Sequence, residues 1–296
     1  MIMKSKPKIG ILGLGVVGTQ FKRWFEGKKY KIGVNLFLYD NKQEKGYSDD
    51  INKAEVIFIT VHTPSLSDGS IDLSFIESAF KGLTGKKIII IKSTVLPGTT
   101  EYFQKKYKQH KILFSPEFLT EENAWGDIYK PKRQIVGFTK NNLDVASMVL
   151  SLLPKAPFMS PSKINTSNPI KITATEAEII KYGGNVFLSR KINLANILNL
   201  LSEKIGANYD NVRLGLGADC RIGSSHLDVH AGGYKGFGGC CIPKDLNAFI
   251  ACLDSCHLLE CVDILKKDRE FNEKLLESQG LTIQDVSICT FSRTKK

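Results

Sequence analysis

Short runs of apolar, mostly β-branched residues alternate with helical patterns through the first half of the chain. The run Ile88–Ile91 is four consecutive isoleucines with no polar alternation, which is typical of a parallel strand covered on both faces. We expect strands at Lys8–Leu12, Asn35–Tyr39, Glu55–Val61, Lys87–Ile91, Lys111–Phe114 and Gln134–Phe138, and helices at Val16–Glu26, Leu73–Leu83 and Thr99–Tyr107. This order predicts an α/β fold with a doubly wound parallel sheet, in which ligands bind at the carboxyl ends of the strands.

The second half has a different pattern, dominated by one long helix without proline over Thr173–Ile205. At 1.5 Å per residue it would span about 50 Å, so we expect it to link two domains or to build a dimer interface. A glycine-rich loop at Ala231–Gly239 precedes more predicted helical structure from Asp245 to about Glu277. The proline-containing segment 156–169 predicts a boundary between a domain over residues 1–165 and an all-α domain over residues 166–296.

Composition excludes several classes of protein. With 42% hydrophobic and 24% charged residues among 296, the chain is neither disordered nor fibrous. No apolar run approaches the roughly 20 residues that cross a bilayer, and the N-terminus resembles a first strand rather than a signal peptide. The net charge of +11 comes from scattered lysines, so we expect a solvated basic surface or an anionic substrate, not a nucleic-acid partner. Seven cysteines, an odd number, favour a reducing, cytoplasmic compartment over a disulfide scaffold.

The segment Gly13-Leu14-Gly15-Val16-Val17-Gly18 follows the first predicted strand and opens a helix. In that context it is typical of a Rossmann-type dinucleotide site: Gly13 permits the turn, Gly15 lets a pyrophosphate approach, and Gly18 allows close packing. Asp40 ends the next strand, where a carboxylate would accept the ribose hydroxyls and repel a 2′-phosphate. The pattern predicts NAD rather than NADP. The alternative is a glycine turn without a ligand.

Three further motifs carry chemistry, each with a plainer alternative. The turn Ser93–Thr99 could present hydroxyls to a ligand or cap a helix. The segment Ser115–Glu121 holds two carboxylates suited to acid–base work or to a helix start. In Gly236–Asp245, a cysteine lies where a glycine-rich loop opens into a helix, which favours a nucleophilic thiolate over an inert buried thiol.

Together these motifs resemble the UDP-glucose/GDP-mannose dehydrogenase family. The resemblance runs in order through GLGVVG, VHTP at Val61–Pro64, STVLPGT, SPEFLTE, EAEIIKYGGNVF, RIGSSH and GFGGCCIPKD, and covers nearly the whole chain. SPEFLTE resembles the UDP-glucose branch, and GDP-mannose enzymes are similar there.

The resemblance implies a role for each matching residue. Cys241 would be the nucleophile that holds the sugar C6 as a thiohemiacetal and then a thioester. The other implied catalytic residues are Lys181, Asn185, Glu117, Asp245 and Thr94. The implied substrate-binding residues are Glu121, Phe118, Leu119, Arg221, Gly238 and Lys235, with Arg221 acting across a dimer interface. The implied NAD-binding residues are Gly13, Gly15, Val16, Val17, Gly18, Asp40, Thr63, Ser93 and Thr94. Spacing adds one independent point: Lys181 and Asn185 are four apart and share a helix face.

The chain also departs from the family pattern. Family members typically carry a third, nucleotide-binding domain, and only 51 residues follow Asp245 in this sequence of 296. Cys240 occupies a position where serine or alanine is common, and Asn123 one where glycine is frequent.

Several functions remain open at this stage. The first is two-step oxidation of UDP-glucose to UDP-glucuronate by a homodimer, with GDP-mannose or another sugar nucleotide as the alternative substrate. A hydroxy-acid or 6-phosphogluconate type dehydrogenase would not need the loop cysteine, and a truncated NAD-binding homologue would show little turnover. No metal site is expected, because the cysteines and histidines at Cys252, Cys256, His257, Cys261, His226 and His230 lack zinc-ligand spacing.

Overall fold

The computed structural model describes residues 6–120, 123–140, 142–162 and 169–287. Its contacts divide the chain into two compact units. Unit 1 comprises residues 1–64 and 71–181, and unit 2 comprises residues 65–70 and 182–296.

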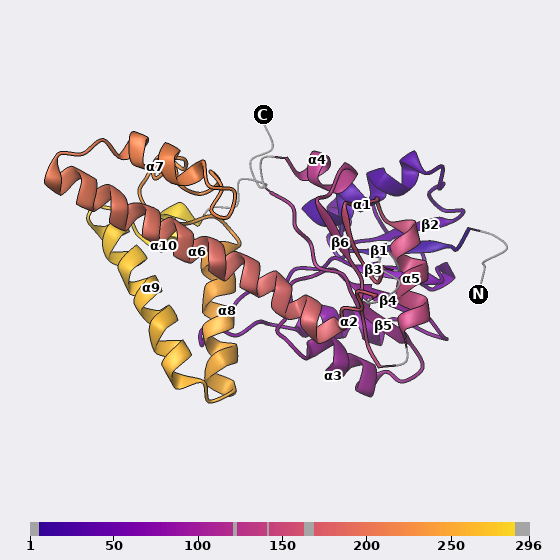
Figure 1. Ribbon diagram of the computed structural model, residues 1–296. Helices are drawn as coiled ribbons and strands as arrows, with labels where there is room; N and C mark the ends of the chain where they lie inside the picture. The colour runs from indigo at the N-terminus through magenta and orange to yellow at the C-terminus, as the bar shows by residue number, and fades with distance from the viewer. Residues whose placement is uncertain (1–5, 121–122, 141, 163–168, 288–296) are drawn as a thin grey trace. The chain divides into compact units, whose positions relative to one another are not determined.

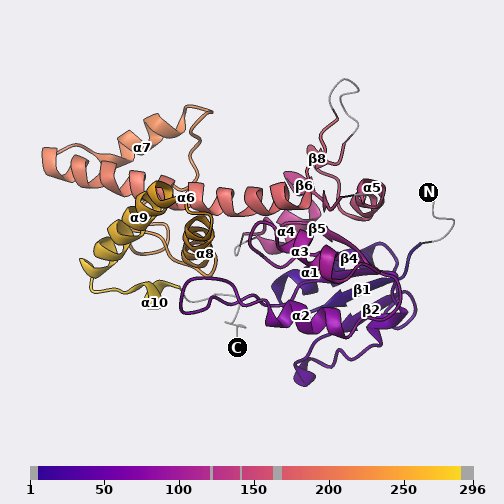
Figure 2. The same ribbon diagram turned by 90° about the horizontal axis from the view of Figure 1, so that it is seen from below.

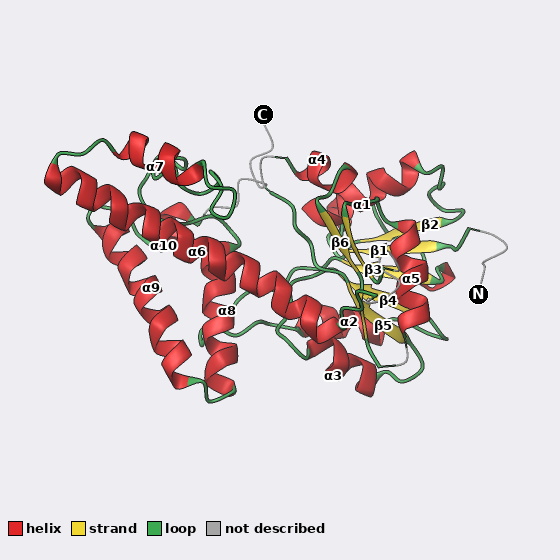
Figure 3. Cartoon of the chain, viewed as in Figure 1, coloured by secondary structure: helices red, strands yellow, loops and turns green. Residues whose placement is uncertain are grey.

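Unit 1 is built on a six-stranded sheet (Figures 1 and 3). Its strands are β1 (Ile9–Leu12), β2 (Leu36–Tyr39), β3 (Val56–Ile59), β4 (Ile88–Ile91), β5 (Lys111–Phe114) and β7 (Gly137–Phe138). The order β2-β1-β3-β4-β5-β7 is parallel from β2 through β5. From β1 the chain adds β2 on one side and β3 on the other, so the order of strand addition reverses at β1. The glycine turn follows the carboxyl end of β1, and doubly wound sheets bind ligands at such a point.

Helices cover both faces of this sheet. Leu36, Leu38 and Ile90 belong to one core with the helices α1 (Val16–Gly27), α4 (Ala124–Tyr129) and α5 (Leu143–Leu152). Phe37, Ile89 and Ile91 belong to the other core with α2 (Ser74–Lys81), α3 (Thr99–Lys106) and the first turns of α6 (Ala174–Ile205). Alternate residues of one strand thus enter opposite cores, so a run such as Ile88–Ile91 has no polar alternation.

The prediction of one strand over Gln134–Phe138 is wrong. The segment forms β6 (Arg133–Ile135), which pairs with β8 (Phe158–Ser160) in a separate two-stranded sheet, and β7, which joins the main sheet antiparallel to β5. Val136 lies between them and donates its N–H to the Ser160 carbonyl at 2.9 Å. Gly137 has no space for a side chain, because an added Cβ would lie 2.7 Å from the Thr173 carbonyl oxygen.

Unit 2 is helical. It contains most of α6, which is 32 residues long in all, and α7 (Tyr209–Gly217), α8 (Ile242–Ser255), α9 (Leu259–Glu277) and α10 (Ile283–Val286). Tyr209 of α7 packs against Ala195 of α6, and Figure 2 shows α7 beside the end of this helix. The long predicted helix is therefore confirmed, with its start at Ala174.

The helical segment expected from Asp245 to about Glu277 consists of two helices, α8 and α9, which pack against each other as a hairpin (Figure 1). The break lies at Cys256–Leu258, where His257 has a φ of 57°. This turn contains no glycine or proline, so no local signal in the sequence marks it.

Candidate functional site

The turn after β1 has the geometry of a dinucleotide site. Gly13 has a φ of 93°, and an added Cβ there would lie 2.9 Å from the Thr60 backbone. A Cβ on Gly18 would collide with the Gly13 carbonyl oxygen, so the helix packs directly on the turn. A Cβ on Gly15 would meet no atom within 4 Å and would fill open space at the start of α1. Val16 and Val17 are the first residues of that helix, whose N-terminus favours an anion.

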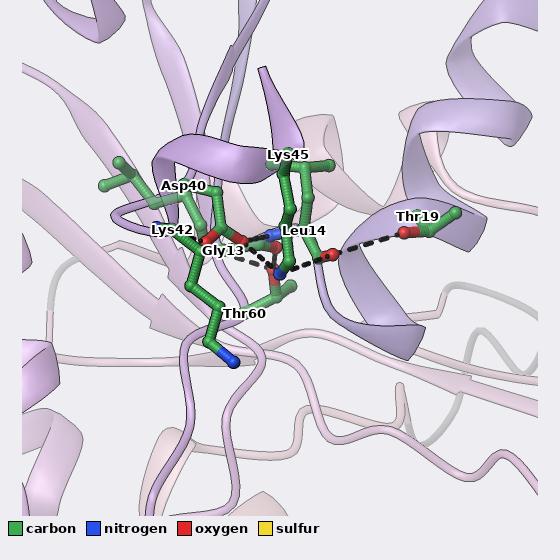
Figure 4. Close-up of polar contacts among 8 residues, drawn as sticks. Gly13, Leu14, Thr19, Asp40, Lys42, Lys45 and Thr60 are labelled. Carbon is green, nitrogen blue, oxygen red and sulfur yellow. Dashed lines mark hydrogen bonds and ion pairs between the residues drawn. The ribbon is translucent and has the colours of Figure 1, made fainter. Parts of the chain in front are cut away.

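Asp40 follows β2 and faces this turn (Figure 4). Its carboxylate accepts hydrogen bonds from the Leu14 N–H at 2.6 Å, the Lys42 N–H at 3.0 Å and the Lys45 ammonium at 2.7 Å. Lys45 also donates to the Leu14 carbonyl at 3.1 Å, so it bridges the carboxylate and the turn. Burial acts to raise the pKa of Asp40, but these hydrogen bonds outweigh it and lower the pKa.

Lys45 is a site residue that our sequence analysis missed. It lies five residues beyond Asp40 in a segment without regular pattern, and only the fold brings its ammonium group to the glycine turn. A ligand that hydrogen-bonds to Asp40 would also lie close to this cation.

Three predicted cofactor residues meet at the carboxyl ends of β3 and β4. The Thr63 hydroxyl donates to the Thr94 carbonyl at 2.9 Å, and the Ser93 hydroxyl donates to the Val61 carbonyl at 2.6 Å. Ser93 and Thr63 are buried, while Thr94 is partly exposed. The structure thus brings Thr63, Ser93 and Thr94 together on two adjacent turns.

A fully buried carboxylate fixes the end of the Ser93–Thr99 turn. Glu178 of α6 accepts the Gly98 N–H at 2.6 Å and both the N–H and the hydroxyl of Thr100 at 2.9 and 2.6 Å. It therefore caps the N-terminus of α3 from another helix. Burial raises the pKa of Glu178 to about 7, against the effect of these three hydrogen bonds.

A pocket of about 700 Å³ lies within unit 1 beside Glu117 and Phe118. The Arg133 guanidinium stacks 3.7 Å from the centre of the Phe118 ring, and the Lys181 ammonium lies 6.0 Å from the same ring. Leu119 packs against the core that contains α1. Glu121, the second predicted carboxylate of this segment, lies outside the described residues.

The predicted nucleophile lies in unit 2. Cys241 is exposed at the N-cap of α8, where the helix terminus favours a negatively charged sulfur. Asp245 lies one turn later, is 1% exposed, and accepts hydrogen bonds from the side chains of Asn185 and Lys244. Asn185 and Asp245 are thus brought together, as the resemblance implies. Lys181 is the last residue of unit 1.

Two side-chain amides, one from α9 and one from the turn that follows it, hold the loop before the cysteine. Asn272 accepts the Phe237 N–H at 2.6 Å and donates to the Phe237 carbonyl at 3.0 Å. Gln279, seven residues on, makes the same pair of bonds with Lys235 at 2.7 and 2.8 Å. The two amides bind the backbone of Lys235 and Phe237, on either side of Gly236, which has a φ of 110°. We call them the amide clamp.

The remaining substrate-binding candidates have other partners in this structure. Gly238 has no room for a side chain, because a Cβ would lie 2.6 Å from the Val286 carbonyl oxygen. Lys235 pairs with Glu203 at 2.6 Å. Arg221 pairs with Asp219 at 2.6 Å, and its side chain is 85% exposed.

The described residues contain neither a membrane-spanning helix nor a metal-binding cluster. None of their helices combines the length and the apolar composition that a bilayer span requires. Within the same part of the chain, no cluster of three or more histidine, cysteine or acidic side chains could hold a metal ion.

Comparison with known proteins gives consistent results. Residues 40–151 match the NAD binding domain of the UDP-glucose/GDP-mannose dehydrogenase family, and residues 175–274 match the family's central domain. A UDP-glucose 6-dehydrogenase of Rickettsia bellii is 35% identical over 214 residues, which cover 68% of this chain and 46% of that protein. One of Bacillus subtilis is 34% identical over 211 residues, covering 68% and 42%. The chain thus spans about half the length of the curated relatives it matches.

The solved structures agree with this assignment. A UDP-glucose dehydrogenase from Pyrobaculum islandicum superimposes with a TM-score of 0.76 at 27% identity, covering 94% of this chain and 73% of that one. A 3-hydroxyisobutyrate dehydrogenase of Mycobacterium tuberculosis shares the fold at 14% identity, with a TM-score of 0.63 over 92% of this chain and 96% of that one. Two models of one family, matched in order on the two units, show that the chain belongs to the UDP-glucose/GDP-mannose dehydrogenase family.

Proposed function

We propose that unit 1 binds NAD at the glycine turn. The open space at Gly15 and the helix N-terminus behind it fit a pyrophosphate, and Asp40 fits the ribose hydroxyls. Lys45, next to Asp40, would contact the same ribose end of the cofactor. Val16, Val17, Thr63, Ser93 and Thr94 would complete the site. We keep residues 1–165 as the proposed cofactor domain and residues 166–296 as the proposed helical domain.

We propose further that the chain carries the catalytic residues of an NAD-dependent nucleotide-sugar dehydrogenase that oxidises C6 of UDP-glucose to give UDP-glucuronate. The observation that carries this proposal is the position of Cys241, exposed at the N-terminus of α8 with the buried, Asn185-bonded Asp245 one turn later. A thiol in that position is suited to attack an aldehyde.

The proposed steps use this chain's own residues. NAD supplies the hydride acceptor in both oxidations. Cys241 as thiolate adds to the C6 aldehyde, and the thiohemiacetal is oxidised to a thioester. The Lys181 ammonium and the Asn185 amide stabilise the developing oxyanion. Glu117 accepts a proton from the water that hydrolyses the thioester, while Thr94 and Asp245 orient water and Lys181.

The remaining substrate contacts are carried over from the family resemblance. Glu121, Phe118, Leu119 and Gly238 would contact the sugar, Lys235 would meet a phosphate, and Arg221 would reach the substrate of a second copy. To do so, Lys235 would have to release its ion pair with Glu203, and Arg221 its ion pair with Asp219. The odd number of cysteines, seven, is the basis on which we keep a reducing, cytoplasmic compartment as a proposal, although Cys240 is disulfide-bonded in the structure.

A substrate panel tests the proposed function. UDP-glucose, GDP-mannose and UDP-N-acetyl sugars would each be incubated with the full chain and NAD, following NADH absorbance. We expect turnover with UDP-glucose. Turnover with GDP-mannose alone would assign the other branch of the family. NAD binding without NADH formation from any sugar would indicate a cofactor-binding homologue.

We propose that unit 2 forms a homodimer through α6. Phe187, Leu194 and Leu201 recur every seven residues along this helix and are 65%, 55% and 54% exposed. An exposed apolar seam of this kind is typical of helix–helix association. Sedimentation at micromolar concentration should give a dimer, and Leu194→Glu should give a monomer. A monomeric parent chain would contradict both the dimer and the cross-subunit role of Arg221.

A further inference from the structure

Lys92 is a buried cation at the carboxyl end of β4. The residue is 3% exposed, and its ammonium group lies 3.1 Å from the Glu117 carboxylate. It also donates to the Ser115 hydroxyl and the Pro116 carbonyl at 3.3 Å each. All of these contacts are within unit 1, and the directly preceding residues are the buried isoleucines of β4.

Lys92 also has an aromatic ring and a second cation near it. The ammonium lies 4.7 Å from the centre of the Phe21 ring of α1. Lys181 of α6 adds a like charge nearby. Burial lowers the pKa of Lys92, and the Glu117 carboxylate opposes that shift. A buried charge is unfavourable unless it is paired, so Glu117 compensates the burial of Lys92.

The Glu117 carboxylate in turn depends on Lys92 for its position. The Glu117 Oε1 atom accepts the Phe118 N–H at 2.9 Å, which fixes one side of the carboxylate. The Oε2 atom is buried and, within the described part of the chain, has no hydrogen bond of good geometry. The ammonium of Lys92 is the cation that faces this oxygen. Glu117 is therefore held between its own backbone and Lys92.

The pair lines the pocket of about 700 Å³ in unit 1. The other charged residues that line it are Asp127, Lys130, Lys132 and Arg133. Asp127 accepts hydrogen bonds from the N–H and hydroxyl of Thr120 at 2.8 and 2.6 Å. Arg133 stacks on Phe118. Of the cations that line this pocket, Lys92 is the one within ion-pair distance of Glu117.

Resting on the proposed function, we propose that Lys92 is a positioning residue, whose buried ammonium fixes the Glu117 carboxylate as the base for hydrolysis of the thioester. In this step the water oxygen bonds to the thioester carbon, the carbon–sulfur bond breaks and the sulfur leaves as thiolate. One proton passes to Glu117 and the other to solvent. Neither NAD nor any other oxidant takes part in the step.

The experiment replaces Lys92 with methionine, which has a similar length and no charge, and with arginine, which keeps the cation. Lys87→Met is the matched control. Lys87 precedes the same strand and donates to the Asn52 and Ala54 carbonyls at 2.6 and 2.8 Å, away from Glu117.

With UDP-glucose and NAD, Lys92→Met should lower kcat by roughly tenfold to a hundredfold with little change in KM, because a displaced catalytic group loses about that much. Mass spectrometry of the quenched chain should show the thioester accumulating on Cys241, as in Glu117→Gln. Lys92→Arg should restore part of kcat. Lys87→Met should accumulate no thioester, even if it lowers stability.

A second measurement tests the pair without turnover. Urea unfolding of Lys92→Met, Glu117→Gln and the double variant forms a double-mutant cycle. We expect a coupling of roughly tenfold in the unfolding constant, about 1.4 kcal/mol. Absence of coupling, or wild-type kcat without thioester in Lys92→Met, would overturn the proposal. A parent chain that makes no NADH would instead refute the proposed function, and the cycle would still decide whether Lys92 fixes Glu117.

Discussion

Removing the buried half of the amide clamp should destabilise unit 2. Asn272 is 1% exposed, and its side chain satisfies both the N–H and the carbonyl of buried Phe237. Asn272→Ala leaves these two backbone groups without partners. A buried unsatisfied group costs about 1–3 kcal/mol, so we expect a loss of about 2–4 kcal/mol in the free energy of unfolding.

Gln279→Ala is the matched control for this prediction. It removes the same pair of bonds from Lys235, but Gln279 is exposed, so water can replace them. The expected loss is about 1 kcal/mol or less. The two substitutions thus remove the same pair of backbone hydrogen bonds, once from a buried residue and once from an exposed one.

Urea unfolding measures both variants. Circular dichroism follows the helices of both units, and the fluorescence of Trp24 and Trp125, both in unit 1, reports unit 1 alone, so a transition seen by circular dichroism without a fluorescence change belongs to unit 2. Because the clamp holds the loop before Cys241, Asn272→Ala should also change the alkylation rate of that thiol, read by peptide mass spectrometry. Equal losses in the two variants, or a loss below about 0.5 kcal/mol in Asn272→Ala, would refute the reasoning.

Three further predictions concern other parts of the site. Burial raises the pKa of Glu178 to about 7 in the folded chain, so between pH 4.5 and 7 the folded state keeps a proton that the unfolded state releases. The contribution of Glu178 to stability should therefore be fully present below pH 4.5 and fall by about 3 kcal/mol as pH rises through 7, and Glu178→Gln should remove this part of the pH dependence in urea unfolding. Asp40→Asn should raise the NADP-to-NAD ratio of kcat/KM by about tenfold, because the carboxylate no longer repels a 2′-phosphate while Lys45 remains; an unchanged ratio would contradict the assignment of Asp40. Cys241→Ser should stop steady NADH formation and Cys240→Ser should keep most of it, whereas the reverse result would shift the nucleophile by one residue.

The sequence patterns located most of the sheet, because each buried strand is an unbroken apolar run. Ile88–Ile91 and Lys111–Phe114 are strands as expected, and α1 and α6 begin within a residue of the predicted starts. The strand β8, three residues long, has no such run, and the turn at His257 has no breaker residue. Local patterns therefore fail where an element is short or where tertiary packing sets the backbone.

In the candidate site, too, local features could be predicted from the sequence and long-range contacts could not. The glycine turn and the residue types after each strand are local features, so they could be found along the sequence. Lys45, Lys92, Glu178 and Asn272 act through contacts with distant segments, such as the 35-residue separation between Asn272 and Phe237. A lysine directly after four isoleucines was a visible signal for Lys92, because a buried strand rarely ends on an unpaired charge.

The number of NADH molecules formed per sugar nucleotide consumed tests the central proposal most directly. Two hydride transfers through a Cys241 thioester require two NADH for each UDP-glucuronate, with one carboxylate formed at C6. The measurement combines NADH absorbance with chromatographic quantification of the product from a limiting amount of UDP-glucose. A ratio of two, falling to one or less in Cys241→Ser, is the expected result. A ratio of one in the parent chain, with an aldehyde or ketone as product, would contradict the account.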